Sequence, residues 1–295
     1  MPEDIVEEQV TFQGDGRLIE AFVARPGPAG PERGTLEIGG RQVEVRLARR
    51  AVTLPAVIVV HEIWGLADHI RDVARRFAAE GYLALAPDLY TGELRDAMTP
   101  ANIMAGMQLL RQAPPDVQRD PRRLQEQFGE FTPEQRRALT TLMDVMSPQR
   151  RAAFSRDLAG AVSYLASRGD IDRTRIGSVG FCMGGGLSGQ LATLSPTLRV
   201  CVIFYGENPP LDAVGRIQAS VLGLYGGEDH RITDTVPAFA ASMTAAGKTF
   251  DYHVYPGAQH AFFNDTRSAT YNSEAAHDAW RRVLDFFGRE FRGDR

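Results

Sequence analysis

The chain has 295 residues, of which 43% are hydrophobic and 24% are charged, so it carries enough apolar material for a full core. This composition excludes intrinsic disorder as a description of the whole chain. The formal net charge is −4 at pH 7 and no run of Lys or Arg exceeds two residues, so we expect no nucleic-acid partner.

The first residues are acidic, unlike a secretory signal, and no apolar run approaches the ~18 residues that a membrane span needs. We therefore expect a cytoplasmic protein with no membrane partner. Cys182 and Cys201 are the only cysteines, and they lack the CxxC spacing of zinc or redox sites. We expect no metal and no cofactor, and we expect Cys201, inside the apolar run VCVIFY, to be a buried core residue.

The N-terminal region differs in pattern from the rest of the chain. Within residues 10–49, polar and apolar residues alternate in several short stretches, which is typical of antiparallel strands. Gly39-Gly40 lies between two of these stretches and predicts a hairpin turn. We expect a layer of edge strands here.

From about residue 50 onward, short β-branched runs alternate with helical stretches, which indicates a mostly parallel, doubly wound sheet flanked by helices. Strands are expected at 55–60, 83–88, 175–181, 200–206, 221–226 and 250–256. Helices are expected at 68–80, 156–167, 235–246 and 274–291, with an apolar helix after residue 182. We predict a single α/β domain over residues 1–295.

Residues 100–150 interrupt this alternation. They contain six prolines, among them Pro114-Pro115, between short helical pieces rich in Arg, Glu and Gln. The pattern predicts a helical insertion, which is either a solvated flap or a lid over the site.

The sequence Gly180-Phe181-Cys182-Met183-Gly184 has the form G-x-nucleophile-x-G at a predicted strand-to-helix junction, with cysteine in place of serine. A sharp turn would hold the nucleophile in a strained conformation, and small residues let the backbones approach. The dipole of the following helix would favour a thiolate. We therefore predict that Cys182 is a nucleophile.

The acid and base of such a site follow the nucleophile along the chain. Asp229 comes after the strand predicted at 221–226, and His260 comes after the strand at 250–256. Both lie where parallel sheets place their sites. We predict that His260 is the base and Asp229 its partner, with Glu228 and His230 as the rival assignments.

His61-Glu62 follows the first core strand, but the zinc pattern HExxH fails because Gly65 takes the place of the second histidine. This loop is instead placed to supply a backbone N–H for an oxyanion, so we predict an oxyanion hole formed by Ile63 and Met183. Aromatic side chains near strand ends are expected to line an apolar substrate pocket; they are Trp64, Tyr90, Phe181 and Tyr205.

The segments VIVVHEIWGL, APDLY, IGSVGFCMGGG, GGEDHRIT and YPGAQHAFF together resemble the dienelactone hydrolase (carboxymethylenebutenolidase) family of α/β-hydrolases. The resemblance covers about residues 50–290, and GFCMGG is its most specific part. It implies the α/β-hydrolase fold, a triad of Cys182, Asp229 and His260, and an extra carboxylate, Glu62, that is hydrogen-bonded to the resting thiol.

A carboxylate beside a thiol disfavours the thiolate. We therefore hypothesise that Glu62 keeps Cys182 protonated until substrate draws the carboxylate away. An alkylation rate of the free enzyme that is unchanged in Glu62→Gln would count against this hypothesis.

The residues that bind substrate depart from the family pattern. The resemblance implies arginines that pair with a substrate carboxylate at two positions, which here are Gly92 and Asn264. Arg95 and Arg267 lie a few residues away and are candidates to replace them.

We predict a cysteine-nucleophile hydrolase that opens a small-molecule ester or lactone through a thioester, and that is a monomer or a small homo-oligomer. Three alternatives stay open. One is a broad-specificity esterase for neutral aryl or alkyl esters, the second is a non-catalytic binding module, and the third is acyl transfer to an acceptor other than water.

Overall fold

A computed structural model of the chain describes residues 4–27, 32–38, 41–47, 53–112, 114, 117, 120, 122–123, 126 and 131–293. Its main feature is an eight-stranded sheet with the order β1-β2-β6-β5-β7-β8-β9-β10. The strands are β1 Ile5–Gln13, β2 Leu18–Pro26, β5 Leu54–Val60, β6 Leu83–Pro87, β7 Ile171–Phe181, β8 Val200–Phe204, β9 Ser220–Gly226 and β10 Phe250–Tyr255. All neighbours from β6 to β10 are parallel. This confirms the α/β class and the mostly parallel sheet.

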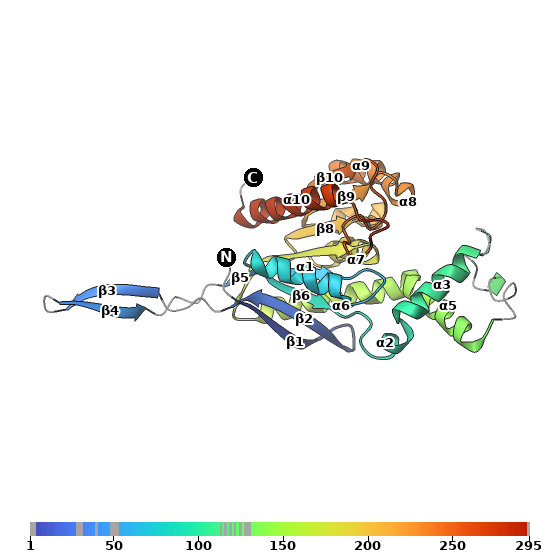
Figure 1. Cartoon of the computed structure of the whole chain (residues 1–295). Coiled ribbons are helices and arrows are strands. Elements are labelled where there is room, and N and C mark those ends of the chain that lie inside the picture. Colours follow the sequence, from blue (N-terminus) through green and yellow to red (C-terminus); the bar gives the residue numbers. More distant parts are fainter. Residues whose placement is uncertain are drawn as a thin grey trace.

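The N-terminal strands divide between two sheets. β1 and β2 form an antiparallel hairpin at one edge of the large sheet, as expected, and β2 pairs with β6. β3 Glu32–Ile38 and β4 Arg41–Leu47 form a separate two-stranded sheet instead, which stands away from the main body (Figure 1). The predicted turn residues Gly39 and Gly40 lie outside the described residues, but Ile38 pairs with Arg41 across that gap.

Helices cover both faces of the large sheet (Figure 1). One face carries α1 Asp68–Ala79 and α10 Ser273–Arg292, whose apolar residues share a cluster with Val57 and Val59. The other face carries α6 Pro148–Ser167, α7 Met183–Leu194 and α9 Val236–Ala245. The alternation of side chains along a strand explains this division, since neighbouring residues of β5 point to opposite faces.

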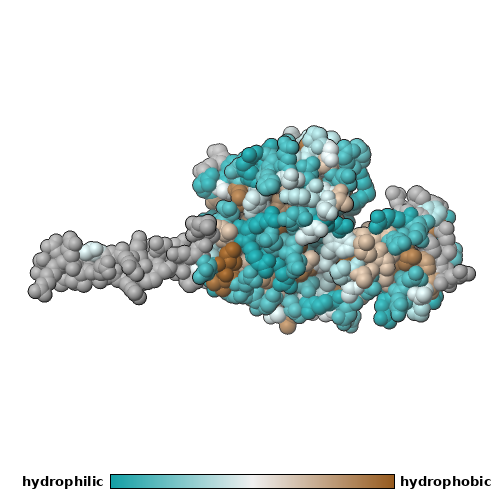
Figure 2. Space-filling model, viewed as in Figure 1, coloured by the Kyte–Doolittle hydropathy of each residue, from teal (hydrophilic) through white to brown (hydrophobic). Residues whose placement is uncertain are grey.

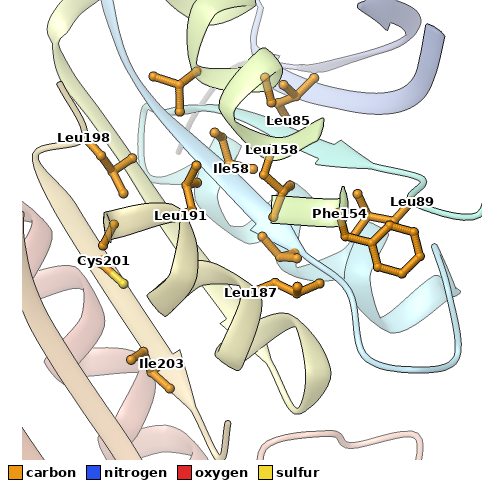
Figure 3. Close-up of a cluster of buried hydrophobic side chains, with 14 of the residues drawn as sticks. Ile58, Leu85, Leu89, Phe154, Leu158, Leu187, Leu191, Leu198, Cys201 and Ile203 are labelled. Carbon is orange, nitrogen blue, oxygen red and sulfur yellow. The ribbon is translucent and has the colours of Figure 1, made fainter. Parts of the chain in front are cut away.

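The core on the α6–α7 face includes side chains of α7, the helix that begins at the turn after β7. Leu187 and Leu191 on α7 pack between Ile58 of β5 and Ile203 of β8 (Figure 3). Cys201 is fully buried in the same cluster, as predicted. This packing fixes the helix whose first residue follows Cys182.

Two further helices, α3 Pro100–Gln112 and α5 Pro133–Met146, pack against each other at the end of the molecule opposite β3 and β4 (Figure 1). The short α2, Glu93–Ala97, contacts α5. Apolar side chains gather on the surface over α3 and α5 (Figure 2).

The helix expected at 156–167 begins earlier, at Pro148. Ser147 caps it, because the serine side chain accepts a hydrogen bond from the backbone N–H of Arg150 at 3.2 Å. Proline at the first helical position needs no N–H partner, so Ser147-Pro148 is a start signal that the prediction overlooked.

Candidate active site

Five of the loops that leave the carboxyl ends of the parallel strands carry polar or reactive side chains. Glu62 follows β5, Cys182 follows β7, Tyr205 follows β8, Asp229 follows β9 and His260 follows β10. Parallel strands bring these loops to one edge of the sheet. Residues up to 198 positions apart in sequence are thereby gathered there, because 260 − 62 = 198.

Cys182 occupies a strained turn between β7 and α7. Its φ is 55° and its ψ is −117°, in a region that side-chain-bearing residues seldom adopt. A Cβ added at Gly180 would lie 1.9 Å from the carbonyl oxygen of Gly184, and one added at Gly184 would lie 2.3 Å from that of Val60. The two glycines therefore allow the close backbone approach that presents the thiol at the start of α7.

His260 and Asp229 form the hydrogen-bonded pair that the chain order predicted. The His260 Nδ1 lies 2.5 Å from Asp229 Oδ2. Burial lowers the pKa of His260, but the hydrogen bond to Asp229 and the interaction with Cys182 outweigh burial and raise this pKa to about 10. The imidazole is thus stabilised as a cation beside the sulfur. The rival candidate His230 lies at the surface near Asp234.

Of the two expected oxyanion donors, Ile63 lies on the loop after β5 and Met183 lies at the start of α7. Met183 is the first residue of α7, so its backbone N–H has no acceptor within the helix. The N–H of Ile63 donates to no backbone carbonyl of the described residues. The peptide that carries the Ile63 N–H is held through its other end, because His61 binds the carbonyl of Glu62. The next peptide is held by Tyr90, whose hydroxyl donates to the carbonyl of Ile63 at 2.8 Å.

His61 supports the same loop from inside the core. It is fully buried, and burial lowers its pKa, so its ring is neutral. Its Nε2 accepts from the backbone N–H of Leu89 at 3.2 Å, so Nδ1 carries the proton and donates to the carbonyl of Glu62 at 2.5 Å. His61 therefore ties the loop after β5 to the loop after β6.

Glu62 is buried, but it does not make the expected hydrogen bond to the thiol. Its Oε1 accepts from the hydroxyl of Tyr205 at 3.2 Å, and its Oε2 accepts from the side-chain amide of Asn264 at 2.7 Å. Because two donors bind the two oxygens, the carboxylate is fixed by its own neighbours.

A cavity of about 210 Å³ lies on this edge of the sheet. Its wall includes Glu62, Trp64, His69, Pro100, Asn264 and Arg267. The guanidinium of Arg267 lies over the ring of Trp64, with its Cζ 4.6 Å from the ring centroid. The cavity therefore combines an aromatic wall with one carboxylate and one guanidinium.

The chain is similar to known proteins of one family. A family model described as the dienelactone hydrolase family matches residues 43–291. The chain belongs to the dienelactone hydrolase family. This match includes all the site residues above, and it makes the chain a hydrolase of the α/β-hydrolase fold.

Individual relatives agree with the family assignment. A protein of Saccharolobus solfataricus that carries a carboxymethylenebutenolidase name is 39% identical over 285 residues, which cover 96% of this chain and 99% of the relative. An Escherichia coli K12 protein with the same name is 32% identical and covers 79% of this chain and 76% of its own length.

Solved structures agree with the fold. A crystal structure described as a dienelactone hydrolase of Klebsiella pneumoniae has 31% identity and a TM-score of 0.65, covering 97% of this chain and all of that chain. A dienelactone hydrolase-like phosphotriesterase from metagenomic libraries has a TM-score of 0.66 at 20% identity, which shows the shared fold alone.

Four of the five expected pocket residues have other surroundings in this member of the family. Phe181 is fully buried and stacks on Phe204, so it belongs to the core. Arg95 forms ion pairs with Glu20 and Asp88, which engage its guanidinium. Tyr205 is also buried, and its hydroxyl binds Glu62. Trp64 does line the cavity, whereas Tyr90 supports Ile63.

Sequence reasoning missed two residues at the site of this hydrolase. Asn264 was noted only for lacking the arginine of the family, and its contact with Glu62 spans 202 positions, beyond any local spacing. His69 on α1 is buried, and its side chain lines the cavity, although nothing in the sequence had marked it as a site residue. A single histidine at the start of an amphipathic helix gives no sequence signal of a cavity beside it.

No group of His, Cys, Asp and Glu side chains in the described part of the chain is arranged to hold a metal ion. Among the helices that the structure describes, none is both long and apolar enough to span a bilayer.

Proposed function

We propose that this hydrolase opens a carboxylic ester or lactone through a thioester on Cys182. The observation that carries the proposal is the hydrogen bond of 2.5 Å between His260 and Asp229 beside the strained elbow of Cys182. A cationic imidazole next to a thiol favours the thiolate, which is the reactive form. The names of the carboxymethylenebutenolidase relatives support the same class of reaction.

The steps follow from this arrangement. The Cys182 thiolate attacks the carbonyl carbon, and the electron pair of the C=O bond moves to the oxygen, which the N–H groups of Met183 and Ile63 stabilise. Collapse breaks the C–O bond of the ester, and His260 gives its proton to the leaving alkoxide. Neutral His260 then takes a proton from water, the resulting hydroxide attacks the thioester, and the thiolate leaves.

The cavity next to Glu62 suggests where the acyl side of the substrate binds. Arg267 is the arginine on its wall, and Trp64 supports the guanidinium from one side. Such a group binds a carboxylate. We therefore propose a lactone or ester that bears a carboxylate, with neutral aryl or alkyl esters as the alternative, because Gly92 and Asn264 supply no second arginine.

The test compares hydrolysis of a dienelactone with that of a neutral p-nitrophenyl ester, for wild type and Arg267→Gln. We expect Arg267→Gln to raise KM for the dienelactone on the order of tenfold, since one hydrogen bond to a charged group is worth about 1.5–3 kcal/mol. The neutral ester should be unaffected. Arg281→Gln, at an exposed position of α10, is the matched control.

Each other outcome identifies an alternative. Turnover of the neutral ester alone favours the broad-specificity esterase, and no turnover of either substrate favours the binding module. Ester consumption that rises with added alcohol or amine favours acyl transfer.

We also propose a single domain in which the start of the insertion borders the substrate, because Pro100 at the start of α3 lines the cavity. Both cysteines are free, and a catalytic thiol must stay reduced, so we propose a cytoplasmic location. The proposed partner is a small-molecule substrate, and the proposed assembly is a monomer or a small homo-oligomer.

A further inference from the structure

β10 is an edge strand of the large sheet, at the opposite end of the strand order from β1 (Figure 1). It is parallel to β9, and the carbonyl oxygens of Thr249 and Tyr255 accept hydrogen bonds from that side at 3.1 and 2.8 Å. Since the backbone groups of successive residues point to opposite sides of a strand, the odd-numbered residues of β10 bond to β9. Phe250, Tyr252 and Val254 therefore point their N–H and C=O groups outward, where no strand of the described chain lies.

One face of β10 is turned toward α9 and is aromatic. The ring of Phe250 meets the ring of Phe239 on α9, with centroids 4.9 Å apart. The ring of Tyr252 stacks on Phe250 at 5.4 Å, and 47% of Tyr252 is exposed. α9 itself contains no charged residue. An exposed aromatic side chain and an uncharged helix thus lie beside the free edge, which is the composition typical of the centre of a protein interface.

The other face of β10 is turned toward α10 and is polar. The carboxylate of Asp251 accepts a hydrogen bond from Arg289 at 2.7 Å, and the hydroxyl of Tyr255 donates to Asp278 at 3.0 Å. His253 lies between these two positions of the strand, and burial lowers its pKa, so its ring is neutral at pH 7. His253 also lines a cavity of about 410 Å³ that is formed by residues of β10 and α10. There is therefore space beside the strand on this face.

The backbone of this edge is complementary to a second copy of itself. If a two-fold axis passes beside Tyr252, this residue stands opposite its own copy in an antiparallel pair, and Phe250 stands opposite Val254 of the second copy. All of these residues point their backbone groups outward, so each pair exchanges its hydrogen bonds. A register shifted by two residues is worse, because it pairs β10 either with Pro256, which has no N–H, or with Lys248, which lies outside the strand.

The side chains fit the same register. Because opposite residues of an antiparallel pair lie on the same face, Asp251 stands opposite His253 of the second copy, and the symmetry forms this pair twice. On the α9 face the two Tyr252 rings meet at the axis, beside Phe250 and Val254. Each copy has a formal net charge of −4, so the copies approach best where the surface carries little charge, as it does over α9. A foreign peptide would form the backbone bonds without these side-chain pairs.

We propose that two copies of the chain pair through β10 about a two-fold axis at Tyr252, so that the two large sheets form one continuous sheet across a homodimer. α9 of each copy then borders the paired strands on one face, and α10 of each copy borders them on the other. This specifies the assembly of the protein, and it does not depend on the reaction proposed for Cys182.

The first test is the mass of the protein in sedimentation equilibrium as a function of concentration. For wild type we expect twice the mass of the chain in the micromolar range. Tyr252→Lys brings two like charges together at the axis, so it should raise the dissociation constant of the dimer by about tenfold or more. Leu194→Lys is the matched control, because Leu194 is also 47% exposed but lies at the end of α7. This control should stay dimeric, and both variants should keep wild-type ester turnover, which shows that they fold.

The second test measures the register of the paired strands. The Cα atoms of a hydrogen-bonded antiparallel pair lie about 5.5 Å apart, a distance that a disulfide spans. Tyr252→Cys should therefore give a disulfide-linked dimer on mild oxidation, with the bond between the two introduced thiols, as seen by non-reducing electrophoresis and peptide mass. Thr249→Cys places its two thiols about 20 Å apart in this register, so it should stay unlinked.

The proposal is overturned if wild type is a monomer throughout the micromolar range, or if the dimer is equally stable in Tyr252→Lys. It is also overturned if Thr249→Cys forms the disulfide as readily as Tyr252→Cys. These outcomes differ from a failure of the proposed function, which would be seen as ester turnover that survives Cys182→Ala.

Discussion

At the residue scale, the charge state of His260 determines how activity depends on pH. Its hydrogen bond to Asp229 and its contact with Cys182 raise the pKa to about 10. The protonated imidazole is the form that gives a proton to the leaving group, and a raised pKa keeps that form at higher pH. Activity should therefore persist to alkaline pH.

We predict that kcat/KM falls with an alkaline limb near pH 10 in wild type. Asp229→Asn should move this limb down by on the order of one pH unit or more, because the carboxylate that stabilises the cation is gone. The measurement is the pH profile of kcat/KM for an ester. Asp234→Asn, which changes the exposed carboxylate beside His230, is the control and should leave the limb in place. An unchanged limb in Asp229→Asn would contradict the role of this pair.

The glycines of the elbow give a second prediction at this scale. Gly184→Ala places a Cβ 2.3 Å from the carbonyl oxygen of Val60, a contact that forces the backbone to move. We expect a loss of about 1–3 kcal/mol in the free energy of unfolding and loss of nearly all turnover. Gly169→Ala, where a Cβ meets nothing within 4 Å, should change stability by less than about 0.5 kcal/mol. Urea unfolding and steady-state kinetics measure both, and an active, stable Gly184→Ala would refute the close packing.

The residues of the triad pair could be predicted because each follows a strand at a position that the chain order specifies. His260 and Asp229 were selected in this way, and their hydrogen bond is present. The partners of Glu62 could not be predicted, since the contact with Asn264 depends on where two distant loops meet. The ion pair of Arg95 with Glu20 could not be predicted for a similar reason, because Glu20 on β2 lies within reach only after the sheet has formed.

At the scale of elements, the contact between helices α3 and α5 affects both the stability of the fold and the shape of the cavity. Leu142 on α5 is fully buried, and Gly106 on α3 lies against it. This contact fixes α3, whose first residue Pro100 lines the cavity. A weaker contact between the two helices should therefore affect substrate binding as well as stability.

We predict that Leu142→Ala lowers the free energy of unfolding by about 2–5 kcal/mol and raises KM with a smaller effect on kcat. Met146→Ala, on the same helix but 52% exposed, should change neither quantity appreciably. Urea unfolding gives the first quantity and steady-state kinetics the second. A KM that stays at the wild-type value in a destabilised Leu142→Ala would mean that α3 and α5 do not shape the cavity.

Most strands and helices from residue 54 onward were predictable because apolar periodicity differs between strand and helix. β5, β6 and α1 lie within about a residue of their expected bounds. The separation of β3 and β4 from the main sheet was not predictable, because alternation shows that strands exist but not which sheet they join. The early start of α6 was missed because its first turn lies in the proline-rich insertion.

At the scale of the whole molecule, the fold gives the two cysteines opposite properties. Cys201 is fully buried, and burial raises its pKa to about 11, whereas Cys182 is partly exposed at the edge of the sheet. In the folded protein the two thiols should therefore differ strongly in their reactivity toward alkylating reagents.

We predict that brief treatment of the native protein with iodoacetamide at neutral pH adds one group, on Cys182, and that the denatured protein takes up two. Intact-mass and peptide-mass measurements give the number and position of the adducts. Two adducts on the native protein, or one on Cys201, would contradict the assigned core and nucleophile.

The proposed reaction requires Cys182 to carry the acyl group during turnover. The most direct measurement is to quench the enzyme in acid while it hydrolyses a p-nitrophenyl ester and to determine the mass of its peptides. We predict that the peptide containing Cys182 gains the mass of the acyl group, and that Cys182→Ala shows neither this adduct nor turnover. An acyl group on another residue, or a Cys182→Ala variant that hydrolyses the ester at the wild-type rate, would contradict the central claim.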